Sequence, residues 1–233
     1  MHPPSVLESA MKDIIRTDLP LRGLLIGLAA IAPIAFPAAQ AGYSTLHALA
    51  CLAIIPAAVL LIVAWALLRK SSASALAALI RDGAVAGALA TVALEAVRYS
   101  GFRMGFMPGN LPELMGVLLF DRFALGPTVA STLGGFAYHF WNGACFGIIF
   151  TLGRFNLPGS WAIPYGAAVG VGFLVSPVVQ GLGVGILGVN FGWHFAATVL
   201  TAHLAFGATM AVLLRRDSAV AATRCRPCGA LAS

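Results

Sequence analysis

The sequence has little charge of either sign. Asp, Glu, Lys and Arg together make up 9% of the 233 residues, whereas hydrophobic residues make up 60%. An ordinary soluble domain holds roughly 25% charged and about 45–50% apolar residues. A water-soluble fold cannot hide this much apolar surface, so the composition excludes an ordinary soluble domain and indicates an integral membrane protein.

The signatures of familiar enzymes are also missing. The sequence contains no glycine-rich phosphate loop ending in lysine, no H-E-x-x-H zinc motif and no G-x-S-x-G nucleophile motif. Their absence weakens the interpretation as an enzyme. It does not exclude one, because membrane enzymes often assemble a site from single residues on separate helices.

Long apolar runs are what the sequence does have. A hydrocarbon core of about 30 Å is crossed by roughly 20 apolar residues in a helix. Six such runs lie at about 23–40, 45–68, 83–102, 128–153, 161–187 and 193–214. The sequence therefore predicts an all-α integral membrane bundle of six transmembrane helices at 21–216, with a polar amphipathic lead at 1–20 and a flexible tail at 217–233.

Basic residues at the breaks between these runs predict the orientation. Cations occur before the first run and after the second, fourth and sixth, and the break at 103–127 carries two, whereas the loops at 40–44 and 188–192 carry none. By the positive-inside rule, both termini face the cytoplasm of a bacterial inner membrane. The net charge of +6 is spread over helix ends, so we expect contact with the lipid bilayer and no nucleic-acid partner.

Two segments leave alternatives open. Ala39-Gln40-Ala41 has the small-x-small form of a signal-peptidase site, so the first helix is either retained or cleaved after Ala41. Cys225 and Cys228 form a C-x-x-C pair, which is half of a four-ligand metal site, a redox dithiol, or an ordinary part of the tail.

The longest break, at 103–127, contains its own short apolar stretch. Leu114 to Phe120 is too short to span a membrane, which predicts an interfacial or re-entrant helix between helices 3 and 4. Asn110 is expected to cap this helix, with Pro112 in its first turn and Glu113 favoured by the helix dipole. We expect the element to form a lid over the outer face of the bundle.

Pairs of glycines four residues apart predict close helix packing. Such spacing lets two helix backbones approach each other. The pairs are Gly23/Gly27, Gly83/Gly87, Gly143/Gly147 and Gly166/Gly170. Together they favour a bundle that is tightly packed in its cytoplasmic half.

Few ionisable residues lie inside the predicted spans, and a group in that position is costly enough to suggest a function. Glu95, His139 and His203 lie at similar depth on three different helices. Arg98 and Asn142 each follow one of them by three residues and share its helix face. The predicted intramembrane polar site comprises Glu95, Arg98, His139, Asn142 and His203, with His47, Glu113 and His194 at the rim of its cavity.

Several uses of these residues remain open. Glu95, His139 and His203 form a two-histidine, one-carboxylate set that suits iron, zinc or manganese, and the two histidines could instead hold haem. Glu95 and Arg98 could equally be a structural ion pair, and the histidines interhelical hydrogen-bond partners. We favour cation- or proton-linked binding or transport of a small molecule. The alternatives are a metal- or haem-dependent oxidoreductase or its subunit, and an accessory subunit that packs its helices on another copy or on a membrane complex.

Three stretches carry a loose resemblance to a known group of proteins. They are Gly101-Phe-Arg-Met-Gly-Phe-Met-Pro-Gly-Asn-Leu-Pro-Glu-Leu-Met-Gly, His139-Phe-Trp-Asn-Gly and Ala202-His-Leu-Ala-Phe-Gly. About half the chain resembles uncharacterised polytopic bacterial inner-membrane proteins, which have no assigned activity. The resemblance implies an inner-membrane location and draws attention to the helices that carry His139 and His203.

Overall fold

The chain folds into helices alone within residues 6–154 and 157–224, the part that the computed structural model describes. The long helices are α1 (Val6–Gln40), α3 (Ile55–Leu68), α4 (Ser74–Arg103), α6 (Val129–Gly153), α7 (Ala162–Leu174) and α9 (Trp193–Arg224). Shorter helices are α2 (Leu46–Leu49), α5 (Leu111–Leu119) and α8 (Pro177–Gly181). A π-helical segment covers Ala50–Ile54, and 3-10 turns cover Gly159–Trp161 and Ile186–Gly188. The all-α prediction is confirmed.

Five segments of the described chain are long and apolar enough to cross a membrane. They are Leu19–Gln40, Leu46–Leu68, Ser74–Arg103, Gly159–Gly181 and Trp193–Arg215. This gives the chain the character of a multi-pass membrane protein, but the predicted count of six spans is not confirmed. The helix α6 corresponds to the predicted run at 128–153. It is long enough to cross a membrane, but its polar and small residues make it less apolar than the five segments above.

The helix bounds differ from the predicted runs at three places. α1 begins at Val6, so the predicted lead at 1–20 and the first span form one helix from that residue on. α4 begins at Ser74, before the predicted start at 83. The predicted run at 161–187 is broken after Leu174, because Pro177 cannot continue a helix and the Ser176 hydroxyl accepts a hydrogen bond from the Val178 amide to start α8.

At the C-terminal end, α9 continues to Arg224, into the predicted tail at 217–233. Cys225 and Cys228 lie outside the described residues. Their role therefore stays open.

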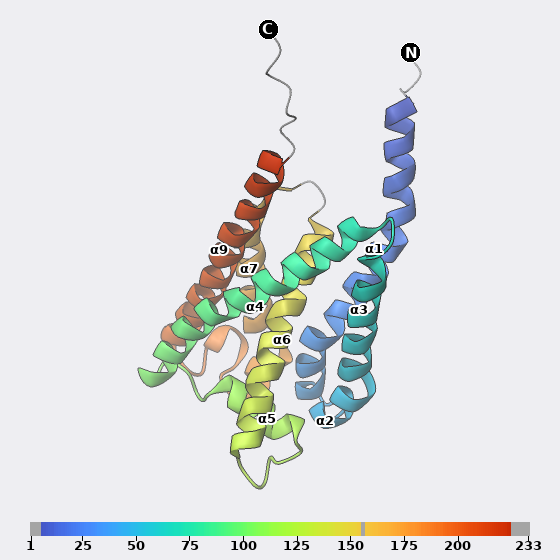
Figure 1. Cartoon of the computed structure of the whole chain (residues 1–233). Coiled ribbons are helices and arrows are strands. Elements are labelled where there is room, and N and C mark those ends of the chain that lie inside the picture. The colour runs from blue at the N-terminus through green and yellow to red at the C-terminus, as the bar shows by residue number, and fades with distance from the viewer. Residues whose placement is uncertain (1–5, 155–156, 225–233) are drawn as a thin grey trace.

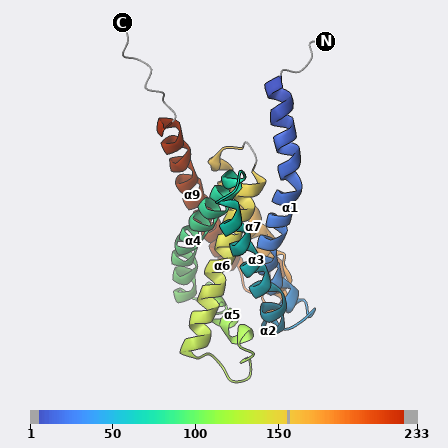
Figure 2. The ribbon, with the colours of Figure 1, turned by 45° about the vertical axis from the view of Figure 1, so that its right-hand side comes forward.

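α6 lies at the centre of the bundle, and α4 crosses it diagonally (Figure 1). α9 lies on one side of α6, and α1 and α3 lie on the other, in both views (Figures 1 and 2). α7 packs against α9. α5 packs across the end of α6 that is far from the start of α1 and the end of α9 (Figure 2). The bundle therefore has two distinct ends, one carrying α5 and one carrying the terminal helices.

Glycines make the crossing of α4 and α6 possible. A Cβ atom added at Gly83 would lie 2.6 Å from the Gly147 carbonyl oxygen, and one at Gly87 would collide with the Gly143 carbonyl. Gly166 is equally close to α9, since its added Cβ would lie 2.9 Å from the Cα of Gly207. These pairs pack as predicted. Gly23 and Gly27 do not, because an added Cβ would meet nothing within 4 Å at either position.

A histidine bond holds the end of α5 against α2. His47 Nδ1 lies 2.9 Å from the carbonyl oxygen of Leu119, and because a carbonyl only accepts, this nitrogen carries the hydrogen. Leu119 is the last residue of α5, where helix carbonyls have no partner within the helix. The bond therefore closes one end of α5 onto a neighbouring helix.

We expect His47→Ala to loosen the C-terminal end of α5. Loss of one hydrogen bond of this kind costs about 1 kcal/mol, which corresponds to roughly fivefold faster backbone hydrogen exchange if the end of α5 opens locally. Exchange measured by mass spectrometry on peptides covering residues 111–123 tests this. Cys51→Ala is the matched control, because Cys51 contacts the other ring nitrogen of His47 and the bond to Leu119 survives. Equal exchange in all three proteins would show that the bond does not hold α5.

Candidate functional site

A buried ion pair on α4 forms the centre of the site. Arg98 Nε lies 2.6 Å from Glu95 Oε1, and Arg98 Nη2 lies 2.6 Å from Glu95 Oε2. The two side chains meet because residues three apart share a helix face. The Arg98 side chain is 4% exposed and the Glu95 side chain 12%, so both charges are largely removed from water and are held by this two-point contact. The pair predicted from the spacing is present.

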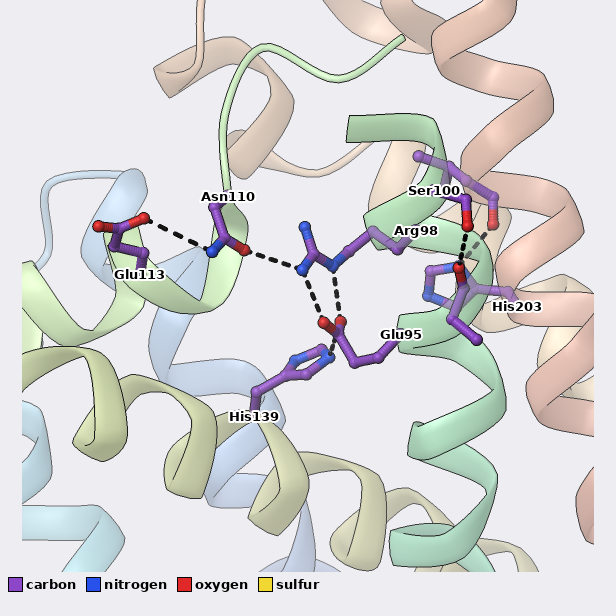
Figure 3. A network of polar contacts seen from close by, with 9 residues as sticks. Glu95, Arg98, Ser100, Asn110, Glu113, His139 and His203 are labelled. Carbon is purple, nitrogen blue, oxygen red and sulfur yellow. Dashed lines mark hydrogen bonds and ion pairs between the residues drawn. The ribbon is translucent and has the colours of Figure 1, made fainter. Parts of the chain in front are cut away.

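His139 joins this pair from α6. Its Nε2 lies 2.9 Å from Glu95 Oε1, the same oxygen that accepts from Arg98 Nε. Glu95 is thus shared between two helices, and the pair becomes part of the contact between α4 and α6. Figure 3 shows His139 and Arg98 approaching the carboxylate from different sides.

The network continues to the start of α5. Arg98 Nη2 also donates to Asn110 Oδ1 at 2.9 Å, and Asn110 Nδ2 lies 3.5 Å from Glu113 Oε2 (Figure 3). Asn110 precedes α5 as predicted, but its side chain makes no capping bond and turns to Arg98 instead. The buried guanidinium offers a charged donor, which outcompetes a neutral backbone amide for the Asn110 oxygen.

A cavity of about 330 Å³ lies against this network. Its wall is mostly apolar and comes from α1, α4, α5, α6, α7 and α9, among other segments. Polar side chains interrupt the wall at six positions: Thr91, Arg98, His139, Asn142, Ser176 and His203. A concave apolar site of this size with a few polar groups is typical of small-molecule binding.

Among the described residues, three polar side-chain atoms of the cavity wall are buried without a hydrogen bond, and one of them, His139 Nε2, has the ion-pair contact with Glu95 in its place. Arg98 Nη1 and Asn142 Oδ1 accept or donate no hydrogen bond within the described part of the chain. Arg98 is 4% exposed and Asn142 is 7% exposed, so neither atom can form a hydrogen bond with solvent outside the protein. Leaving such an atom unpaired costs about 1–3 kcal/mol, which calls for a partner supplied from within the cavity.

The exposed part of the cavity wall lies on α1 and α7. Ile34 and Gly172 are exposed, and the other residues that line the cavity are buried or half-buried. Ile34 is 61% exposed and lies on α1 within a segment apolar enough to cross a membrane. The entrance is therefore bordered by apolar helix surface.

His203 reaches the same cavity but not the ion pair. Its Nδ1 donates to the Val199 carbonyl of its own helix at 2.8 Å, and its ring stacks on Phe173 from α7. Figure 3 shows it on α9, apart from Glu95 and His139. The structure thus brings Glu95, Arg98 and His139 into one network and leaves His203 to one side.

The predicted metal set is not formed. No group of three or more His, Cys, Asp or Glu that could hold a metal ion occurs among the described residues. The physical reason is that His203 is held by the Val199 carbonyl of its own helix, so only His139 and Glu95 of the predicted set are in contact. The haem alternative stays a prediction.

The three residues predicted to lie at the rim of the cavity do not line it and make other contacts. His47 holds the end of α5, and Glu113 contacts Asn110. His194 stacks between Trp193 and Phe106, with ring centroids 3.8 Å and 4.6 Å away, and lines a separate groove between α4 and α9. None of the three is among the residues that line the cavity.

Sequence reasoning missed several parts of the site. The sequence predicts Asn110 as a helix cap, and its closeness to Arg98 in the chain is the available signal for its second use. Pro33 and Pro37 of α1 line the cavity, and their presence inside an apolar run was the available hint. Thr91 and Ser176 carried no signal, because single hydroxyl residues are common in apolar helices.

Comparisons with protein-family models, with curated proteins and with solved structures find no match to this chain.

Proposed function

We propose that this chain is a multi-pass protein of a bacterial inner membrane that binds a small molecule in its intramembrane cavity, with a proton-accepting group in the wall. The observation that carries the proposal is the cavity of about 330 Å³ in which Arg98 and Asn142 each present a buried, unpaired polar atom. A bound molecule would satisfy both atoms and remove their desolvation cost. The positive-inside rule supports cytoplasmic termini and hence an outward position for α5 and the cavity.

The proposal includes α6 as a sixth span. Its polar residues face α4 and the cavity, and α1, α4 and α5 all pack against it. A helix surrounded in this way presents little side-chain surface to lipid, so it does not need the apolarity of an outer helix. This supports the count of six and an even number of crossings.

A proton at His139 would change the charge of the cavity wall. Glu95 and Arg98 cancel each other, and histidine is the side chain that ordinarily changes charge between pH 5 and 8. The charged and titratable groups around His139 are Glu95 and Arg98 on α4, Glu113 through Asn110, and His203 across the cavity. Proton-linked binding would act at His139, because this histidine contacts the ion pair in the cavity wall.

Octanol binding to the detergent-purified protein tests the proposal. We expect Val169→Phe to weaken binding by about tenfold or more, because Val169 lines the cavity and a larger ring would fill it. Val171→Phe is the matched control, since this neighbour on α7 is exposed and does not line the cavity. Labelled octanol and equilibrium dialysis give the affinity of each protein. Equal affinity of the wild type and Val169→Phe for octanol would mean that octanol does not occupy the cavity. This result would contradict the proposal.

A further inference from the structure

The two unpaired atoms in the cavity wall define the head of the ligand. Arg98 Nη1 is a donor that needs an acceptor, and Asn142 Oδ1 is an acceptor that needs a donor. They come from different helices, α4 and α6, and both residues line the same cavity. A hydroxyl satisfies both requirements with one group, since it accepts through its oxygen and donates its hydrogen.

The charges of the wall favour a neutral head. Glu95 neutralises Arg98 at 2.6 Å, so the pair leaves no net charge for a bound ion to balance while His139 is neutral. An anion would then add an uncompensated charge to a mostly apolar cavity, and so would a cation. Only a polar head without formal charge avoids this cost.

The entrance determines the body of the ligand. Ile34 and Gly172 are exposed on the side of the bundle, on segments apolar enough to lie in a membrane. A molecule that enters between α1 and α7 therefore comes from the hydrocarbon region and not from water. Most of the remaining wall is apolar, which suits a hydrocarbon chain or ring behind the polar head.

Resting on the proposed function, we infer that the cavity takes a membrane-soluble molecule with an apolar body and a terminal hydroxyl. The hydroxyl oxygen accepts from Arg98 Nη1, and its hydrogen is donated to Asn142 Oδ1. The apolar body extends toward the opening at Ile34 and Gly172. The network of Glu95, His139 and Asn110 keeps Arg98 in place for this contact.

Two probes of equal chain length separate this inference from the proposed function. Octanol both donates and accepts, whereas methyl octyl ether only accepts. Because one hydrogen bond is lost, we expect the wild-type protein to bind octanol about five- to tenfold more tightly than the ether. Octanoate at neutral pH is the third probe, and we expect it to bind more weakly than octanol.

A variant of Asn142 completes the test. Asn142→Leu is expected to remove the preference for octanol over the ether while both still bind, because the acceptor Oδ1 is lost and Arg98 is unchanged. Ser100→Ala on α4 is the matched control, since the Ser100 hydroxyl bonds its own helix outside the cavity, and it is expected to keep the wild-type preference.

The outcomes distinguish two failures. Equal wild-type affinity for octanol and the ether, tighter binding of octanoate, or an unchanged preference in Asn142→Leu would each overturn the hydroxyl inference while leaving a binding cavity. If Asn142→Leu does not fold, the wild-type comparison of the three probes decides alone. Binding of none of the probes would overturn the proposed function itself.

Discussion

Replacing Gly147 with valine is expected to prevent α4 and α6 from packing and to yield little folded protein. A Cβ atom at Gly147 would lie 2.9 Å from the backbone nitrogen of Gly87 and would collide with the Gly83 carbonyl. These are backbone atoms that cannot rotate away, so the two helices must separate. Overpacking of a core commonly costs 1–3 kcal/mol, and we expect a loss of about 3 kcal/mol or more at this crossing. Thermal unfolding of the detergent-purified protein, followed by circular dichroism, measures it.

Gly27→Val is the control for this prediction. Gly27 also belongs to a predicted glycine pair, but an added Cβ meets nothing within 4 Å there. Both substitutions replace a helical glycine by valine, so they share the same small change in intrinsic helix propensity. Equal melting temperatures for the two variants would contradict the importance of the α4–α6 crossing.

Breaking the Glu95–Arg98 pair from either side is expected to destabilise the protein strongly. Arg98→Leu leaves a buried carboxylate with only His139 beside it, and Glu95→Leu leaves the guanidinium with Asn110. Removal of one partner of a buried pair costs about 3–5 kcal/mol, because the other charge is left uncompensated. The free energy of unfolding of each variant, measured in the same detergent, tests this expectation.

The double variant Glu95→Leu/Arg98→Leu is expected to be more stable than either single variant. Removing both charges together leaves no uncompensated ion, and such replacements of a buried pair are often neutral in stability. A double variant whose destabilisation equals the sum of the two single losses would mean that the charges act independently. The 2.6 Å contacts argue against that result.

The network also explains how α5 is placed over the site. Asn110 at its start binds Arg98, and the Leu119 carbonyl at its end binds His47. Leu111 and Met115, between these two points, line the cavity. The expected covering element thus exists as a nine-residue helix tied at both ends, and its position relative to a membrane surface stays a prediction.

Local features of the site could be predicted because they depend on one helix only. Glu95 and Arg98 are three residues apart, so their pairing followed from helix geometry before any packing was known. His203 had no such constraint. Its contacts depend on how α9 is rotated against α7, and that rotation turned the ring toward Phe173 and away from the carboxylate.

The glycine pairs show the same difference between features that one helix determines and features that helix packing determines. Spacing alone treated Gly23/Gly27 and Gly143/Gly147 as equal, yet only the second pair faces another helix. A glycine pair permits close approach but does not choose a partner, since the partner lies far away in the sequence. The choice is made by the packing of all the helices together.

By itself, the sequence determined that this protein is helical, apolar enough for a membrane, and poor in charge except for a few buried groups. These properties follow from composition and from periodicities within single helices, which are local. Only the tertiary structure decided that Glu95, Arg98, His139 and Asn110 form one network, that a cavity opens beside it, and that Arg98 Nη1 and Asn142 Oδ1 remain unpaired there. Those facts depend on the crossing angle and register of α4, α5 and α6, which no local pattern specifies.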